Sequence, residues 1–105
     1  MTEPRPAPTL ASLRARRDEI LRIAARHGAR NVHVFGSVAR GAAGGGSDVD
    51  LLVDMSPDAR GFAYFGALDG LRRALSSALG APVDVVDRAA LSRLRRRVLD
   101  EAIPL

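Results

Sequence analysis

Two aspartates, Asp48 and Asp50, directly follow a run of glycines in the stretch FGSVARGAAGGGSDVDLLV, residues 35–53. Residues two apart in a strand point to the same face of a sheet, so these two carboxylates are expected to project together. Like charges side by side are unfavourable unless a cation or a shared proton offsets the repulsion. Carboxylates without histidine or cysteine suit Mg²⁺ or Mn²⁺, which proteins hold with one or two carboxylates plus substrate phosphates. The alternative is a pair of exposed polar residues on the solvent face of a half-buried strand.

A possible phosphate-binding turn precedes the aspartates. Gly36 and Ser37 follow a β-branched segment, at a point where a short helix can open and present free backbone N–H groups to an anion. Glycine lets a phosphate approach the backbone, the Ser37 hydroxyl adds a donor, and Arg40 adds a charge-assisted one. Taken alone, Gly36 and Gly41 are equally consistent with an ordinary turn. The combination of this turn with a carboxylate pair indicates a bound, metal-complexed phosphate.

A third carboxylate lies in the segment PVDVVD, residues 82–87. If this segment forms a strand beside the one that carries Asp50, the Asp84 side chain can join the pair while Val83 and Val85 face the opposite side. The alternative for Asp84 is a solvated strand residue. Asp87, three residues later, is predicted to cap the helix that follows.

The composition limits the kind of protein. The chain has 105 residues, of which 47% are hydrophobic, no cysteine, and a formal charge of +4 from sixteen arginines and twelve acidic residues. We expect one domain, without disulfides or thiolate metal sites. No apolar run is long enough to span a membrane, so a soluble, cytoplasmic protein is expected. Because the basic and acidic residues are interspersed and aromatic residues are few, direct binding of nucleic acid is not expected.

Helical and strand periodicity divide the rest of the chain. Residues 1–8 contain three prolines and predict a flexible arm, and residues 9–105 form the single domain. β-Branched segments at residues 31–36, 47–55 and 82–87 predict strands. Residues 37–44 predict a short helix or turn that the triple glycine at residues 44–46 ends. Apolar spacing predicts a first helix that begins after the cap Thr9 and ends at Gly28. It predicts a second helix that ends at Gly80 and carries an apolar stripe of Phe62, Phe65, Leu68, Leu71, Leu75 and Leu79. A terminal helix is predicted with Leu91, Leu94, Val98 and Leu99 on one side. Strands that alternate with helices indicate an α/β fold, a small sheet covered by helices.

The stretch Gly36 to Met55 resembles the motif of the DNA polymerase β-like nucleotidyltransferases, and specifically of the minimal nucleotidyltransferases, the MntA-type antitoxins of HEPN/MNT systems. The shared pattern is Gly-Ser, then Arg-Gly, then Ser-Asp-x-Asp-Leu-Leu-Val. The resemblance extends over nearly the whole chain, because VDVVD at 83–87 is similar to the family's third-carboxylate strand and RVLDEAIPL at 97–105 to its usual ending. It implies the small mixed sheet of the polymerase β-like fold.

The resemblance also implies roles for individual residues. Asp48 and Asp50 would bind two Mg²⁺ ions, and Asp84 would complete the metal site nearest the attacking hydroxyl. Gly36 and Ser37 would hold the triphosphate of ATP, and Arg40 would bind phosphate or brace the loop. The implied reaction is in-line attack of a hydroxyl on the α-phosphate with release of pyrophosphate. In the resembled systems the acceptor is a tyrosine of the HEPN toxin, an RNase that the antitoxin neutralises by transferring AMP.

Two other functions are open at this point. A non-catalytic antitoxin would neutralise its toxin by binding alone, with the arginines of the terminal helix, Arg93 and residues 95–97, as an interface. A transferase of another kind would use RNA or a small molecule as acceptor. The three retained aspartates favour catalysis, and the absence of a further domain and of aromatic residues argues against the RNA and small-molecule acceptors.

Overall fold

The computed structural model describes residues 7–56, 58, 61–91 and 96–105. The predicted arm, residues 1–8, falls mostly outside this range. The elements run in the order α1 (Leu10–Ala15), α2 (Arg17–Arg26), β1 (Ala29–Phe35), α3 (Gly36–Ala39), β2 (Val49–Met55), α4 (Phe62–Leu79), β3 (Val83–Asp87), the 3-10 turn η1 (Arg88–Ala90), α5 (Arg96–Glu101) and β4 (Ile103–Pro104).

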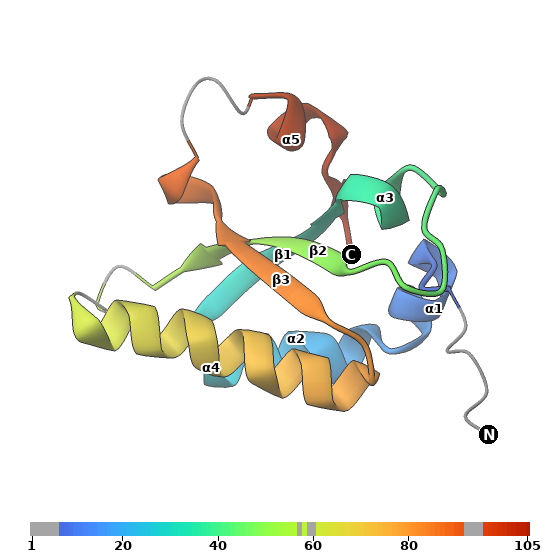
Figure 1. The fold of residues 1–105 in the computed structure, drawn as a ribbon. Helices are drawn as coiled ribbons and strands as arrows, with labels where there is room; N and C mark the ends of the chain where they lie inside the picture. Colours follow the sequence, from blue (N-terminus) through green and yellow to red (C-terminus); the bar gives the residue numbers. More distant parts are fainter. Residues whose placement is uncertain (1–6, 57, 59–60, 92–95) are drawn as a thin grey trace.

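The four strands form one mixed sheet in the order β3-β2-β1-β4. Strand β1 is antiparallel to both β2 and β4, whereas β2 and β3 are parallel and are connected through α4. Helices α2 and α4 cover one face of the sheet, and α3 and α5 lie on the other side (Figure 1). The predicted α/β fold with a small mixed sheet covered by helices is confirmed.

The main core lies between the sheet and helices α2 and α4. Val49, Leu51 and Val53 of β2 are at most 1% exposed, which confirms that they face the core while the residues between them face the other way. Ile20 and Leu71 bury their side chains in the same cluster. The central strand is therefore fixed in register by its apolar side chains, because a slip of one residue would bury the aspartates instead.

The predicted first helix is two helices. Thr9 caps α1 as expected, in a reciprocal pair of hydrogen bonds with Ser12, but the chain leaves helical geometry at Arg16 before α2 begins. The Arg16 N–H bonds to the carbonyl of Leu13 in a tighter turn, and its guanidinium bonds Glu19 in the first turn of α2. Gly28, with a φ of 76°, follows the end of α2 in the left-handed conformation that the sequence predicts.

Helix α4 ends at the left-handed Gly80 as predicted, but two phenylalanines of its first turn are exposed. Phe62 and Phe65 are 97% and 67% exposed, so the predicted apolar stripe of this helix is not buried at its first turn. The start of α4 lies at the end of the sheet (Figure 1), where Tyr64 bonds to Asp87 of β3 while the phenylalanines at positions 62 and 65 are exposed. Leu71 and Leu75 are the fully buried residues of this helix.

The C-terminal segment adds a strand that the sequence does not predict. Residues 103–104 form β4 and pair with β1 through the contacts of Val34 with Ile103 and of His33 with Pro104. Of the predicted terminal helix, the structure describes α5, and residues 92–95, with Leu94, lie outside the described residues. A two-residue strand has too little sequence for a periodic signal.

Candidate active site

The first two carboxylates of the site come from neighbouring parallel strands. Asp50 on β2 and Asp84 on β3 are direct partners in the register, as are Val49 and Val83 one position earlier. The N–H of Val49 donates to the carbonyl of Pro82 at 2.9 Å and so aligns the starts of both strands. Because partner residues point to the same face, the Asp50 and Asp84 side chains lie next to each other on the face opposite the main core.

Asp48 lies just outside the sheet. The predicted strand at residues 47–55 begins two residues later, at Val49, and Asp48 is exposed in the connection before it. A compact turn presents this residue, since Gly44 N–H donates to the Ser47 hydroxyl at 2.8 Å and Ser47 N–H donates to the Gly44 carbonyl at 3.0 Å. The serine before the aspartates therefore defines the end of the glycine-rich loop.

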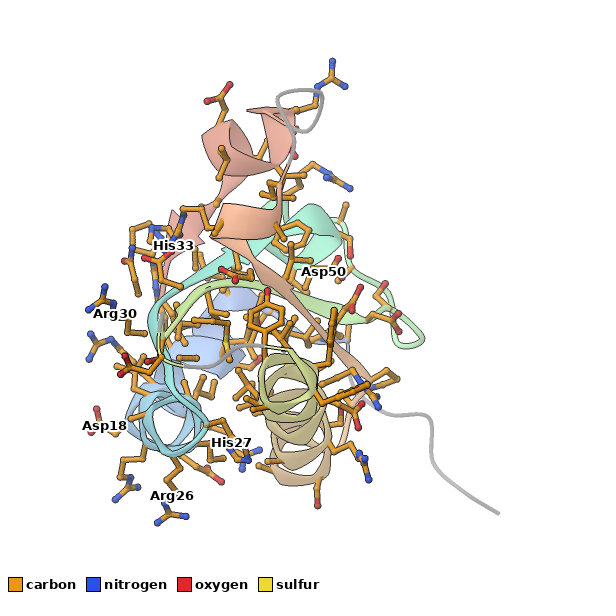
Figure 2. All side chains as sticks on the ribbon, turned by 90° about the vertical axis from the view of Figure 1, so that its left-hand side faces the viewer. Asp18, Arg26, His27, Arg30, His33 and Asp50 are labelled. Carbon is orange, nitrogen blue, oxygen red and sulfur yellow. The ribbon has the colours of Figure 1, made fainter. Side chains whose placement is uncertain are left out.

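The electrostatics of the site centre on Asp50. Burial of its carboxylate raises the pKa of Asp50 above the ordinary value, and the negative charges of Asp84 and Asp48 raise it further, whereas the positive charge of Arg40 lowers it. Three carboxylates thus act on one another even though Asp48 is outside the strand. Figure 2 shows Asp50 on the α3 side of the sheet and His27 on the side of α2 and α4.

Gly36 is required at its position for two reasons. Its φ is 72°, in the left-handed region that only glycine adopts without strain. A Cβ atom here would also collide with the Asp50 carboxylate, with its Cγ at 3.2 Å and its Cβ at 3.4 Å from the added atom. The backbone of the Gly-Ser turn therefore lies directly against the carboxylate pair.

The other two predicted phosphate contacts flank this turn. Ser37 is half-buried in α3, and within the described residues its hydroxyl has no hydrogen-bond partner. Arg40 follows the same helix, and its Nη1 lies 3.3 Å from Oε2 of Glu101 on α5. Ser37 thus lies in the one-turn helix that begins beside Asp50, and Arg40 lies directly after it.

The donor set fits a divalent cation that a substrate helps to bind. Within the part of the chain that the structure describes, no group of three or more histidine, cysteine, aspartate or glutamate side chains is close enough to hold a metal ion alone. The fit rests on the in-register carboxylates of Asp50 and Asp84, hard oxygen ligands whose mutual repulsion a cation relieves. Mg²⁺ commonly completes such a pair with phosphate and water oxygens.

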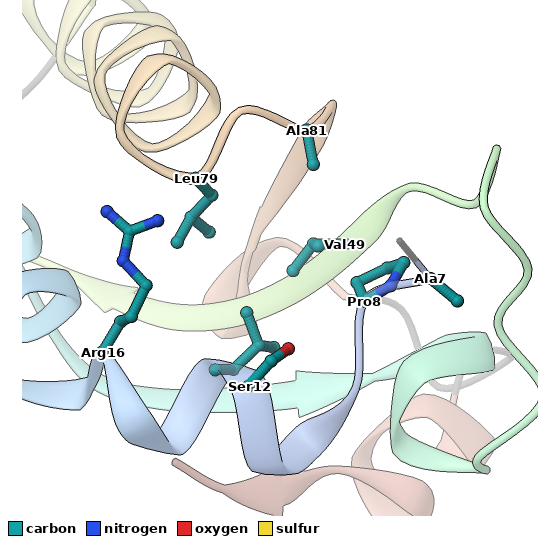
Figure 3. Close-up of a pocket in the computed structure, with 8 residues that line it drawn as sticks. Ala7, Pro8, Ser12, Arg16, Val49, Leu79 and Ala81 are labelled. Carbon is teal, nitrogen blue, oxygen red and sulfur yellow. The ribbon is translucent and has the colours of Figure 1, made fainter. Parts of the chain in front are cut away.

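Two cavities lie near the site but do not contain the carboxylates. One, of about 220 Å³, opens between α1, the end of α4 and the core side of the first residue of β2 (Figure 3), and is lined by Ala7, Pro8, Ser12, Leu13, Arg16, Val49, Leu79 and Ala81. Another, of about 340 Å³, borders α3 and is lined by Pro8, Thr9, Leu10, Val38, Ala39, Arg40, Gly41 and Ala43. Neither cavity is lined by the carboxylate pair, of which Asp84 is exposed and Asp50 is half-buried.

Two polar clusters are missing from the sequence-based interpretation. Arg88 donates to Asp54 at 2.5 Å and to His33 Nδ1 at 3.1 Å, and the side-chain amide of Asn31 donates to the other Asp54 oxygen at 2.9 Å. The side-chain hydrogen bond from Asn31, and then that from Arg88, lower the pKa of Asp54 despite partial burial. The cluster joins the end of β3 to β1 and β2, and no local sequence signal predicts contacts between residues so far apart.

The second cluster is buried under η1. Asp87, 7% exposed, accepts a hydrogen bond from the Ala89 N–H at 3.2 Å, which confirms its predicted capping role. Its other oxygen accepts from the hydroxyl of Tyr64 at 2.7 Å. Burial and this hydrogen bond raise the pKa of Tyr64, the one tyrosine of the chain, to about 12. Both groups hold α4 against β3 and lie on the core side of the sheet.

The mixed sheet, the Gly-Ser turn after β1 and the aspartates at the start of β2 together define a domain of the nucleotidyltransferase type. The family model described as "Nucleotidyltransferase domain" matches residues 17–105, and the chain belongs to this family. No curated protein matches the sequence. Among described residues, no helix is both long and apolar enough to cross a membrane.

Solved structures place the chain among the small members of the family. A structure assigned as a minimal nucleotidyltransferase is 48% identical, with a TM-score of 0.74 over 93% of this chain and 97% of the other. A chain of a toxin-antitoxin structure with AMP-PNP is 22% identical, with a TM-score of 0.66 over 83% and 69%. A chain of the complex between tri-AMPylated Shewanella oneidensis HEPN toxin and MNT antitoxin is 21% identical, with a TM-score of 0.60 over 87% of this chain and 69% of the other. The last two share the fold.

Proposed function

We propose that this protein is a metal-dependent protein adenylyltransferase, an antitoxin that transfers AMP from ATP to a tyrosine of a cognate HEPN toxin. The observation that carries the proposal is the in-register pair of Asp50 and Asp84, with the backbone of Gly36 packed directly against the Asp50 carboxylate. A triphosphate bound at this turn lies within reach of both carboxylates, so one cation can contact the protein and the nucleotide together. The protein would act in the cytoplasm, where ATP is available.

The site has one group of residues for the cation and another for the triphosphate. Asp50 and Asp84, with Asp48 at the rim, supply oxygen ligands for Mg²⁺ or Mn²⁺, which when bound offsets the charge on the phosphates and on the attacking oxygen. The Gly36 and Ser37 turn holds the triphosphate through backbone N–H groups and the free hydroxyl. Arg40 adds positive charge beside the same carboxylates.

These residues orient the triphosphate for one substitution. The acceptor oxygen forms a bond to the α-phosphorus as the bond from that phosphorus to the β-phosphate oxygen breaks, and pyrophosphate leaves with the electron pair. The acceptor proton passes to solvent or to a carboxylate of the site. Positioning and electrostatic stabilisation account for most of the acceleration in phosphoryl transfer, so a small open site is sufficient.

The proposed partner rests on the relatives. The structural neighbours include a toxin-antitoxin complex with AMP-PNP and an AMPylated HEPN toxin with its MNT antitoxin. Neutralisation by binding alone, and transfer to RNA or a small molecule, are the alternatives that the experiment must separate.

The test is the intact mass of the HEPN toxin after incubation with this protein, Mg²⁺ and ATP. We expect a gain of one or more AMP units, and none with the Asp48→Ala, Asp50→Ala double variant. The matched control is the Asp18→Ala, Asp100→Ala variant, which removes two exposed aspartates outside the site and should retain activity. A stable complex that forms without any mass gain would contradict transfer and support neutralisation by binding. A gain on RNA or an aminoglycoside instead would contradict the protein acceptor.

A further inference from the structure

The ion pair between Arg40 and Glu101 joins two elements that are distant in sequence. Nη1 of Arg40, directly after α3, lies 3.3 Å from Oε2 of Glu101, the last residue of α5. The side chains are 54% and 36% exposed, so solvent screens the pair and it contributes little to the free energy of unfolding. The main effect of this contact is therefore on the orientation of the Arg40 side chain and not on stability.

Glu101 is held in place by the edge of the sheet. Two residues after it, Ile103 pairs with Val34 of β1, and the next residue, Pro104, accepts a hydrogen bond from Arg14 Nη2 at 3.2 Å. The chain end is anchored again where the Leu105 N–H donates to the carbonyl of Val32 at 3.1 Å. The short strand β4 therefore anchors the backbone that follows Glu101 to β1, and the carboxylate of Glu101 bonds to Arg40.

Arg40 keeps donors for a second anion while it is bound to Glu101. Within the described part of the chain, its guanidinium makes this single hydrogen bond, through Nη1, so Nε and Nη2 remain available. Its backbone N–H bonds to the carbonyl of Gly36, which ties the residue to the turn beside Asp50. The positive charge of Arg40 lowers the pKa of Asp50, so the two side chains interact electrostatically.

We propose that Glu101 is a positioning residue that holds the Arg40 guanidinium beside the Asp50 and Asp84 pair, so that its free N–H groups meet the triphosphate of the nucleotide. The inference rests on the proposed nucleotidyl transfer and adds a residue from the C-terminal segment to that site. An arginine side chain loses rotamer entropy when it is immobilised. A carboxylate that restricts the side chain before binding reduces that cost to the ligand.

The first measurement is the affinity for Mg²⁺ with AMP-PNP, by calorimetry on the full chain. We expect Glu101→Gln to weaken binding roughly two- to five-fold, the range of an exposed ion pair. Asp100→Asn is the matched control, because it removes the same charge from the adjacent, exposed position of α5, and its affinity should equal that of the wild type. In turnover, KM for ATP should rise by the same factor as the dissociation constant while kcat is unchanged.

A double-mutant cycle with Arg40→Ala separates positioning from other effects. In the Arg40→Ala background, Glu101→Gln should have no further effect on affinity. If Glu101→Gln still weakens nucleotide binding in that background, Glu101 acts through something other than Arg40. If Glu101→Gln and Asp100→Asn lose affinity equally, the effect of Glu101 is one of net charge. Either result overturns the inference. If Glu101→Gln does not fold, Glu101→Asp, which keeps the charge on a shorter side chain, carries the same comparison. A wild type that does not bind the nucleotide contradicts the proposed function itself, whereas binding that is insensitive to Glu101 contradicts the inference alone.

Discussion

Substitution of Gly36 by alanine should damage the site by two separable effects. At a φ of 72°, any Cβ costs about 1–2 kcal/mol of backbone strain, partly offset by about 0.4–1 kcal/mol because alanine restricts the unfolded chain. The added Cβ also collides with the Asp50 carboxylate and pushes that side chain out of its rotamer, which costs about another 0.5–1.5 kcal/mol. The free energy of unfolding of Gly36→Ala should therefore fall by roughly 1–3 kcal/mol.

Gly41 provides a matched control for the strain alone. Its φ is 70°, nearly the same as at Gly36, but nothing lies within 4 Å of an added Cβ. Gly41→Ala should lose about 0–1.6 kcal/mol, since backbone strain, partly offset in the unfolded chain, is the only cost. The difference between the two variants then measures the collision with Asp50, and it should disappear when both substitutions are made in an Asp50→Ala background.

Thermal unfolding with and without Mg²⁺ and ATP is the assay. For a domain of this size, 1 kcal/mol corresponds to roughly 4–8 °C in Tm, so the variants are readily distinguished. The wild type and Gly41→Ala should be stabilised by the nucleotide and metal, and Gly36→Ala should not, because its Asp50 is displaced. If Gly36→Ala and Gly41→Ala have equal Tm values and equal nucleotide-induced shifts, the contact between the turn and the carboxylate has no energetic role and the reasoning is refuted.

Two further predictions concern residues outside the site. Asp54 has a lowered pKa because Asn31 and Arg88 bond its charged form, so it stabilises the folded state above its unfolded pKa of 3.8 and this contribution is lost as the pH falls through the lower folded value. Urea unfolding should therefore show a smaller loss of stability for Asp54→Asn than for the wild type between neutral pH and pH 3, and parallel profiles would contradict the assignment. Phe62→Ser should change the free energy of unfolding by less than about 0.5 kcal/mol, and Leu71→Ala should lower it by about 2–5 kcal/mol, as measured by chemical denaturation; comparable losses would show that Phe62 is buried in solution.

Local patterns in the sequence predict the central strand and the position of its carboxylates. Val49, Leu51 and Val53 are buried on the core face as the alternation predicts, and Asp50 and Asp54 point to the other face. Leu52 lies between these aspartates on the second face and is also fully buried, so that face is only partly accessible. Capping by Thr9 and Asp87 is also predicted correctly, because a cap depends only on residues within a single turn.

Patterns of the same kind fail where an element extends beyond its neighbours. Phe62 and Phe65 continue the apolar spacing of α4 but are exposed, whereas Tyr64 of the same turn bonds to Asp87 at the end of β3. The break at Arg16 has a similar origin, since apolar residues on both sides of it keep helical spacing while the chain turns between them. Periodicity states which face of a helix is apolar, and it does not state how far the packing partner extends.

For the candidate site, the local motif is a property of the sequence and its completion is a property of the fold. The Gly-Ser turn and the aspartates at positions 48 and 50 are close in the chain, and the antiparallel pairing of Phe35 with Asp50 brings the turn beside Asp50, whereas Asp48 lies before the strand and not on it as predicted. The partnership of Asp50 with Asp84 needs the parallel register of β2 and β3, and the contact of Arg40 with Glu101 needs β4 on the opposite edge. These contacts join residues more than thirty positions apart, and only the packing of the whole core brings such residues together.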